Sequence, residues 1–455
     1  MSTLRQVESR RDLLQDMAGQ TKGQKRKLFE LGLSFFLFGL INNVLYVIIL
    51  SAALDLVPPS TPKGIIAFSN IAPALLAKIG WPYILKGKIR YTRRVVGCCL
   101  LSFVGMLVIA LRDSLSSRLL GISLASFSSG LGELTFLQLS TTYNPPSVGG
   151  HSVGYFASGT GAAGLVGAFL WWELRGLGVR LGVGLSSVLP FLLPVTYFLV
   201  LPRPGAFLDR IISPYAPLSV GGRDVPTLGG TEDATLLESK SPVFLTLAEK
   251  WRLLKPMVPV YVLPLCMFAS FPATFGVAPT LLYPVPSPEH HSLISKIIHS
   301  IRDYYPLWQL VYQSTVFVSR SSISLGLRPL PARFLSVPAV VQFVILLTLA
   351  HEAAVGFFPE DEGISIAFVF VLISIEGICG GLAYVNVFYR INQERSDPST
   401  VLDMERGKQE CEFKIGSLGF SDSLGILLAS LLAVPTEVEL CRLQVARGKL
   451  LCQGL

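Results

Sequence analysis

Residues 31–50 read LGLSFFLFGLINNVLYVIIL and contain no charged side chain. About 20 mostly apolar residues are what an α-helix needs to cross a hydrocarbon core about 30 Å thick. Further stretches of this kind follow along the chain, which predicts an all-α polytopic membrane protein with about eleven spans. The other ten lie at 65–85, 95–111, 119–139, 153–172, 181–201, 257–282, 304–321, 334–350, 364–387 and 415–434.

The composition and the charge distribution agree with a multi-pass protein. Of 455 residues, 51% are hydrophobic and 15% are charged, whereas soluble domains carry about 25% charged residues. The net charge of +8 could indicate nucleic-acid binding, but Lys and Arg concentrate in the N-terminal tail and in alternate loops. This positive-inside distribution places the N-terminus in the cytosol and predicts no nucleic-acid partner. Lys78 falls inside the span 65–85 and belongs to neither side.

The spans divide into two halves around a polar segment without apolar periodicity. Two halves of about six helices are typical of major facilitator transporters, so we expect a major-facilitator-like fold with six spans in the first half and five in the second. The expected parts are a cytosolic basic N-tail at 1–30, the halves at 31–201 and 257–434, a flexible cytosolic loop at 202–256 and a C-terminal tail at 435–455.

Three acidic residues inside the predicted spans are the main functional candidates. Glu133, Glu376 and Asp422 each occupy a position where a carboxylate is costly. Such residues usually face a cavity and mark proton or substrate pathways. We therefore predict that they carry protons, with a helix–helix hydrogen bond from a neutral acid as the alternative. Ser421 and Ser423 could hydrogen-bond the Asp422 carboxylate locally.

Other polar residues in the spans could line a substrate path. Arg320 lies near the cytosolic end of its predicted span, where it could bind an anionic group, pair with an acid or extend to the interface; extension to the interface is the preferred interpretation. The remaining candidates are uncharged and could instead hold helices together. They are Asn42, Asn43, Ser158, Thr160, Tyr384 and Asn386.

No motif of an enzyme, a cofactor site or a metal site is recognised in the sequence. It lacks H-E-x-x-H, G-x-S-x-G and a histidine box. His290 and His291 lack a third ligand at suitable spacing, so no metal site is predicted. The seven cysteines show no disulfide framework and are interpreted as apolar packing residues. We expect the protein not to be an enzyme.

One short signal in the loop 202–256 bears on the destination of the protein. Glu232 is followed, after three spacers, by Leu236 and Leu237. Adaptor-read signals for endosomes and lysosomes have this form, so sorting adaptors are possible partners of the loop. At the C-terminus, Cys452 is fourth from the end, but Gln453 and Gly454 are poor residues for a prenylation box.

Several ordered strings resemble the battenin family of lysosomal and fungal vacuolar membrane proteins. They are GLINNVLYVIILSAA at 39–53, SGLGELTF at 129–136, SGTGAAG at 158–164, VFVSRSS at 316–322, EGICGGLAYVN at 376–386 and SDSLG at 421–425. The chain departs from the family at 269–276, where ASFPATFG stands in place of an acidic residue followed by Tyr and Asn-Gln-Gly. The resemblance implies a major-facilitator-like fold in a lysosomal or vacuolar membrane.

The family is associated with vacuolar pH homeostasis and basic amino-acid transport in fungi, and with glycerophosphodiester efflux in animals. The resemblance therefore implies a vacuolar transporter of small molecules, with arginine and lysine as substrates coupled to protons. A glycerophosphodiester exporter of the same fold is an alternative. The rival class is a membrane scaffold that does not transport and recruits trafficking or proton-pump regulators through the loop 202–256.

Overall fold

The protein is helical throughout the part of the chain that can be described. The computed structural model describes residues 22–52, 56, 64–84, 89–207, 245–270, 276–286, 294–296, 298–358, 361–394 and 401–454. Within these ranges there are helices and no strand. The all-α prediction is therefore confirmed.

The first half begins with five long helices and ends with an interrupted one. The long helices are α2 (Lys22–Ser51), α4 (Gly64–Ile84), α5 (Tyr91–Leu111), α6 (Leu115–Ser140) and α7 (Pro146–Leu174). The next crossing combines α8 (Gly178–Ser186), η2 (Leu189–Phe191), α9 (Leu192–Val195) and η3 (Thr196–Val200). Pro190 and Pro194 lie within it. Because proline lacks a backbone N–H, it interrupts the regular hydrogen-bond ladder there.

The described part of the second half contains four long helices and one interrupted crossing. Its first crossing combines α11 (Leu247–Met257), η5 (Val258–Val262) and α12 (Leu263–Ser270). Thr246 and Glu249 form a capping box that starts α11. The long helices are α13 (Tyr304–Arg320), α14 (Val337–Ala354), α15 (Glu362–Gln393) and α16 (Val401–Ala446), and the short turn η10 (Leu451–Gly454) ends the described chain.

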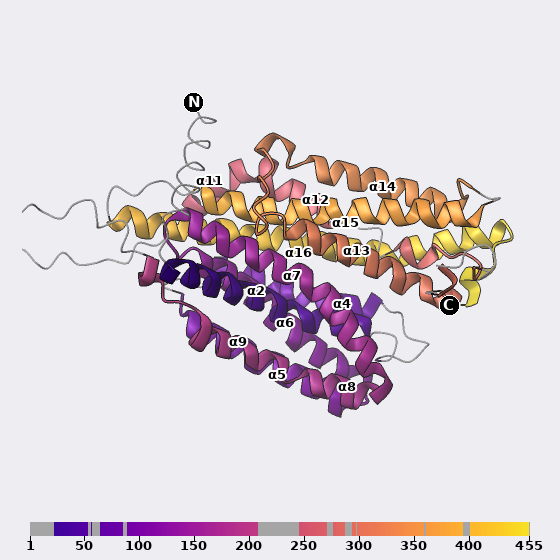
Figure 1. The fold of residues 1–455 in the computed structure, drawn as a ribbon, viewed down its shortest axis with the longest axis horizontal. Coiled ribbons are helices and arrows are strands. Elements are labelled where there is room, and N and C mark those ends of the chain that lie inside the picture. Colours follow the sequence, from indigo (N-terminus) through magenta and orange to yellow (C-terminus); the bar gives the residue numbers. More distant parts are fainter. Residues whose placement is uncertain are drawn as a thin grey trace, which may run out of the picture.

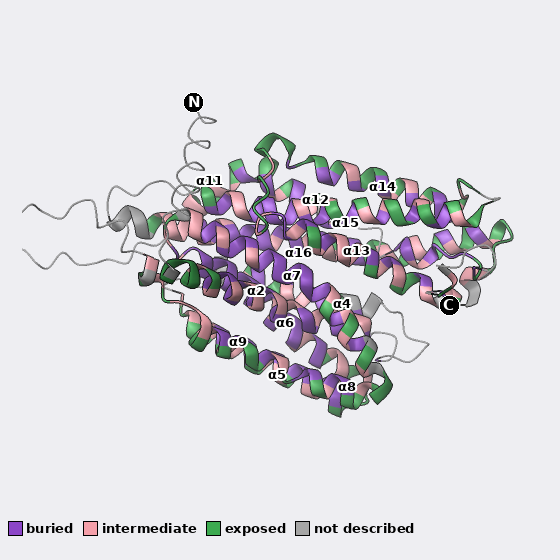
Figure 2. Ribbon diagram, in the orientation of Figure 1, coloured by how far each residue is buried: buried purple, intermediate pink, exposed green. Residues whose placement is uncertain are grey.

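Eight helical segments in the described ranges are long and apolar enough to cross a membrane. They coincide with eight of the predicted spans, which confirms a polytopic membrane protein. The other three predicted spans fall on α4, on η5 with α12, and on α13. Figure 2 shows exposed residues along α5, α8, α9 and α14 and buried residues along α2, α6 and α7. Exposed apolar side chains such as Leu181, Leu199 and Leu347 suit a surface that faces lipid.

Small residues let the helices approach closely. A Cβ on Gly159 would lie 2.0 Å from the backbone oxygen of Phe36, and one on Gly39 would lie 2.2 Å from that of Phe156. These two glycines therefore form the crossing of α2 and α7. Across the halves, a Cβ on Gly161 of α7 would lie 2.9 Å from the Cα of Phe317 in α13. Close backbone packing of this kind is how helices associate in lipid.

The two halves lie side by side, with corresponding helix ends at the two ends of the bundle (Figure 1). We call the end where α2 begins the amino end, and the opposite end, which holds η10, the carboxy end. α6 ends and α7 begins at the amino end, and the last turns of α15 also lie there. With 46 residues, α16 is about 69 Å long. It therefore extends well beyond a hydrocarbon core of about 30 Å.

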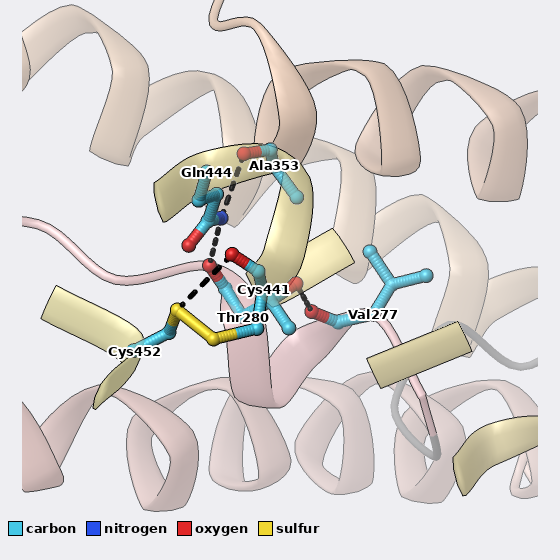
Figure 3. Close-up of a disulfide and its surroundings, with 6 residues drawn as sticks. All are labelled: Val277, Thr280, Ala353, Cys441, Gln444 and Cys452. Atoms are coloured by element: carbon cyan, nitrogen blue, oxygen red, sulfur yellow. Dashed lines mark hydrogen bonds between the residues drawn. A yellow bond between two sulfur atoms is a disulfide. The ribbon is translucent and has the colours of Figure 1, made fainter. Parts of the chain in front are cut away.

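The interpretation of all seven cysteines as packing residues is wrong for two of them. Cys441, near the end of α16, and Cys452, in η10, form a disulfide (Figure 3). Periodicity and spacing along the chain did not reveal this pair, because η10 turns back toward α16 after a break at Gly448. Gln444 fixes the same region by donating hydrogen bonds to the carbonyl oxygens of Thr280 and Ala353. The Cys452 sulfur is therefore already bonded and is not a free prenylation site.

Removing this disulfide should lower stability. For the Cys452→Ser variant we expect a loss of about 3 kcal/mol, because the bridge closes a short loop and constrains the unfolded chain. Thermal unfolding of the purified protein in detergent measures the effect. Reductant should lower the melting temperature of the wild type to that of the variant and leave the variant unchanged. Cys379→Ser, which replaces a free cysteine, is the matched control and should still respond to reductant.

Candidate functional site

An ion pair between two helices of the first half is the centre of the candidate site. The Lys78 ammonium in α4 donates to Glu133 Oε2 in α6 at 2.7 Å. The two residues are only 2% and 8% exposed. The sequence predicted a costly carboxylate at Glu133, and the structure places a cation beside it that compensates its charge. Breaking a buried pair by removing one partner costs about 3–5 kcal/mol, because it leaves an uncompensated charge.

Residues of the second half complete the coordination of this ion pair. Tyr384 in α15 donates its hydroxyl to Glu133 Oε1 at 2.8 Å. The Lys78 ammonium donates a second hydrogen bond, 2.8 Å long, to Ser423 Oγ in α16. The pair therefore joins both halves of the molecule. A charge held at the boundary between two halves is placed to respond when they move relative to each other.

Arg320 of the second half also forms a contact with the first half. From α13 it donates to Thr160 Oγ1 in α7 at 2.7 Å. Its guanidinium carbon lies 4.1 Å from the centre of the Tyr384 ring, within the range of a cation–π interaction. The preferred interpretation, that Arg320 extends to the membrane interface, is wrong, because its guanidinium points into the protein. Its Nε is buried and makes no hydrogen bond to any described residue.

Asp422 is the second acid of the site, and its neighbouring serines do not bind it. Asp422 is 6% exposed. Its carboxyl group interacts electrostatically with Lys78, Glu133 and Arg320. Ser421 donates to the backbone oxygen of Val262, and Ser423 accepts from Lys78. The predicted local hydrogen bonds to the carboxylate are therefore absent among the described residues.

The other predicted site residues lie outside this cluster. Glu376 is fully buried on α15, but two helical turns separate it from Tyr384, about 12 Å along the axis. Asn42 donates to the backbone oxygen of Ser129 and so joins α2 to α6. Three more candidates form their hydrogen bonds outside the cluster. Asn43 donates to the Gly39 backbone oxygen, and Ser158 and Ser324 share a hydrogen bond between their hydroxyls. Asn386 accepts from the Leu330 backbone N–H.

A second set of polar contacts joins the halves at the amino end. Tyr91 and Gln138, from α5 and α6, hydrogen-bond Glu412 of α16 through its carboxylate and its backbone oxygen. Asn392 of α15 donates to Ser140 Oγ at the end of α6 at 3.0 Å. Toward the carboxy end the helices of the two halves diverge in Figure 1. The boundary between the halves is therefore held together at the amino end.

Lys78 is the residue that sequence reasoning left without a role. The only signal was a basic residue inside a predicted span, which is costly and usually points to a partner. That signal could have paired Lys78 with an acid, but three acids in spans were available. The tertiary structure selects Glu133. The predicted sorting residues Glu232, Leu236 and Leu237 lie outside the described residues, as do His290, His291 and most of the unusual segment 269–276.

The arrangement of the two halves is typical of one class of membrane protein. Two helical halves meet around buried charged side chains that both halves contribute, and polar contacts hold one end of the boundary together. This is the arrangement of a multi-pass membrane transporter, whose site lies between its halves near the middle of the membrane.

Comparison with known proteins identifies the family. The family profile described as CLN3 protein matches residues 33–443. Protein BTN1 of Cryptococcus neoformans is 44% identical, covering 98% of both chains. Protein btn1 of Schizosaccharomyces pombe is 37% identical, covering 93% of this chain and 97% of its own. The chain belongs to the CLN3 or battenin family, as its sequence strings indicate.

One solved structure is similar over most of the chain. The human organic anion transporter MFSD10 is matched over 95% of this chain and all of its own, with a TM-score of 0.49 and 12% sequence identity. A likeness this distant says nothing of the substrate.

Proposed function

We propose that this protein is a proton-linked transporter of the vacuolar membrane that carries basic amino acids, arginine and lysine, and so contributes to vacuolar pH homeostasis. One observation supports it most directly: Lys78, Glu133, Tyr384, Arg320 and Asp422 meet at the boundary between the halves. Charged groups buried in a membrane protein are costly and serve substrate or proton pathways.

The site contains groups that suit both ends of an amino acid. The Arg320 guanidinium, with its unbonded Nε, is a suitable partner for a carboxylate. Glu133 supplies a carboxylate that can pair with a cationic group of the substrate. When Asp422 is ionised, the acidic and basic members of the site balance one another, so a substrate with charges of both signs can be bound without a large net charge in the membrane.

The same guanidinium also favours a second substrate. Arg groups recognise phosphate as well as carboxylate, so glycerophosphodiesters are the other candidate. The sidedness follows from the positive-inside distribution, which makes the amino end cytosolic. On that assignment, the polar contacts around Glu412 and Asn392 close the cytosolic side, and the state described here faces the vacuolar lumen.

Flux in proteoliposomes tests the proposal. The purified full-length chain is reconstituted, a pH gradient is imposed, and uptake of radiolabelled arginine, lysine and glycerophosphodiesters is measured. We expect saturable, gradient-dependent movement of arginine and lysine. Movement of the phosphodiesters alone would select the second candidate. No flux of any of them, from protein with a cooperative thermal transition, would contradict a transporter and direct attention to partners of the loop 202–256.

A further inference from the structure

Lys78 is bonded to one acid and adjacent to another. Its ammonium lies 2.7 Å from Glu133 Oε2 and 2.8 Å from Ser423 Oγ. Ser423 follows Asp422 directly in α16, so the same ammonium acts electrostatically on both carboxyl groups. Because its four-carbon stem is flexible, a lysine can change partners by rotation of its side-chain bonds.

Asp422 has no direct partner in this state. Among the described residues, its carboxyl group makes no hydrogen bond and no basic side chain lies within 4.0 Å of it. Ionising a carboxyl group that is only 6% exposed and has no cation in contact is costly, so we take Asp422 as the neutral acid in this state. When the group is ionised, it requires a cation nearby.

Lys78 and Glu133 belong to the first half, whereas Asp422 belongs to the second. α4 and α6 are packed closely: a Cβ on Gly130 would lie 2.6 Å from the backbone oxygen of Ala74, and Ser126 donates to the backbone oxygen of Asn70. Lys78 and Glu133 therefore move together. Asp422 and Ser423 lie on α16 in the other half, so any rocking of the halves changes the distance from Lys78 to Asp422 more than its distance to Glu133.

We propose that Lys78 is the charge that couples proton release to the movement of the two halves, by passing from Glu133 to Asp422 when Asp422 is ionised. This inference rests on the proposed transport function. In the state described here Asp422 holds a proton and Lys78 pairs with Glu133. In the other state the proton has left to the solvent on the open side, and the ammonium pairs with Asp422.

The net charge of the site falls by one unit between the two states, which is the charge of the proton that leaves. With Asp422 protonated, the site holds two cations and one anion; after release it holds two of each. Glu133 keeps the hydrogen bond from Tyr384 and the attraction of Arg320 when the ammonium leaves. The groups that face Lys78 and Asp422 come from each neighbouring helix. They are Tyr46 of α2, Glu133 of α6, Cys266 of α12, Tyr312 and Arg320 of α13, and Tyr384 of α15.

The Asp422→Asn variant tests this exchange, because its side chain can never ionise. Substrate exchange across the membrane needs no proton release, whereas net uptake driven by a pH gradient does. We expect the ratio of net uptake to exchange to fall at least about tenfold, equivalent to about 1.4 kcal/mol. A pH-sensitive dye trapped in the vesicles should report no proton movement with the substrate. Asp422→Glu, which keeps the acid, should restore part of both signals.

The same ratio of net uptake to exchange is measured for a control variant. Glu352→Gln replaces another buried acid, which accepts from Tyr283 and the Phe357 backbone at the carboxy end, and should keep the wild-type ratio. A wild-type ratio and proton signal in Asp422→Asn would overturn the inference and leave the proposed function intact. Normal coupling in the double variant Lys78→Met with Glu133→Gln would do the same, even if Asp422→Asn were unstable. Absence of flux in the wild type would overturn both.

Discussion

Replacing Glu133 by glutamine is expected to abolish gradient-driven flux. The amide cannot compensate the Lys78 ammonium 2.7 Å away, so the variant leaves a cation unpaired inside the membrane. Losing one partner of a buried pair costs about 3 kcal/mol or more, which corresponds to a decrease of more than about a hundredfold in rate if the cost falls on the transport step. Uptake of the transported substrate in proteoliposomes measures this.

The double variant Lys78→Met with Glu133→Gln separates the effect on transport from that on folding. It removes both charges and replaces them with groups of similar size, which is often neutral for stability. We expect its melting temperature to return toward the wild-type value, while flux stays absent. Normal flux with a normal pH profile in Glu133→Gln alone would remove Glu133 from the mechanism.

Replacing Arg320 by glutamine is expected to have the second large effect. The variant loses the cation over the Tyr384 ring, 4.1 Å from the guanidinium carbon, and the charge-assisted hydrogen bond to Thr160. A desolvated cation–π contact contributes about 2 kcal/mol, and a hydrogen bond from a charged group about 1.5–3 kcal/mol. Flux should therefore fall about a hundredfold or more if substrate depends on this arrangement.

Two matched variants show which property of Arg320 matters. Arg320→Lys keeps the charge but loses the planar fork that binds two oxygens at once, so we expect a raised substrate concentration for half-maximal flux. Thr160→Val removes the hydroxyl that accepts from Arg320 and donates to the Ala157 backbone oxygen, and it should have a smaller effect than either change at Arg320. If Arg320→Gln transported like the wild type with unchanged substrate affinity, Arg320 would be a packing residue and not part of the site.

The close packing of the helices was predictable from local sequence. Gly159 and Gly161 lie in a string of small residues, and such strings in apolar helices indicate close approach. The structure shows that approach at Phe36 and Phe317. The identities of the partner helices were not predictable, because a small residue marks a contact surface without specifying what packs there.

The candidate site was predictable in part. Glu133, Asp422, Arg320, Thr160 and Tyr384 were singled out in the sequence and do come together. Asn42 instead hydrogen-bonds the Ser129 backbone in a neighbouring helix, and Asn386 hydrogen-bonds the Leu330 backbone in a loop. An amide in a span serves packing as readily as function. The disulfide between Cys441 and Cys452 also escaped prediction, since a single pair of cysteines has no framework spacing.

The sequence alone determined that lipid is the solvent, that the chain forms helices, and that its charges are distributed asymmetrically between the loops. These properties depend on local composition and length, because every backbone group in hydrocarbon must be satisfied within its own helix. Only the tertiary structure decided that Lys78 pairs with Glu133, that Arg320 points inward, and that Asp422 has no direct partner among the described residues. The reason is that pairing between helices depends on their relative rotation and depth, which the sequence of one helix does not encode.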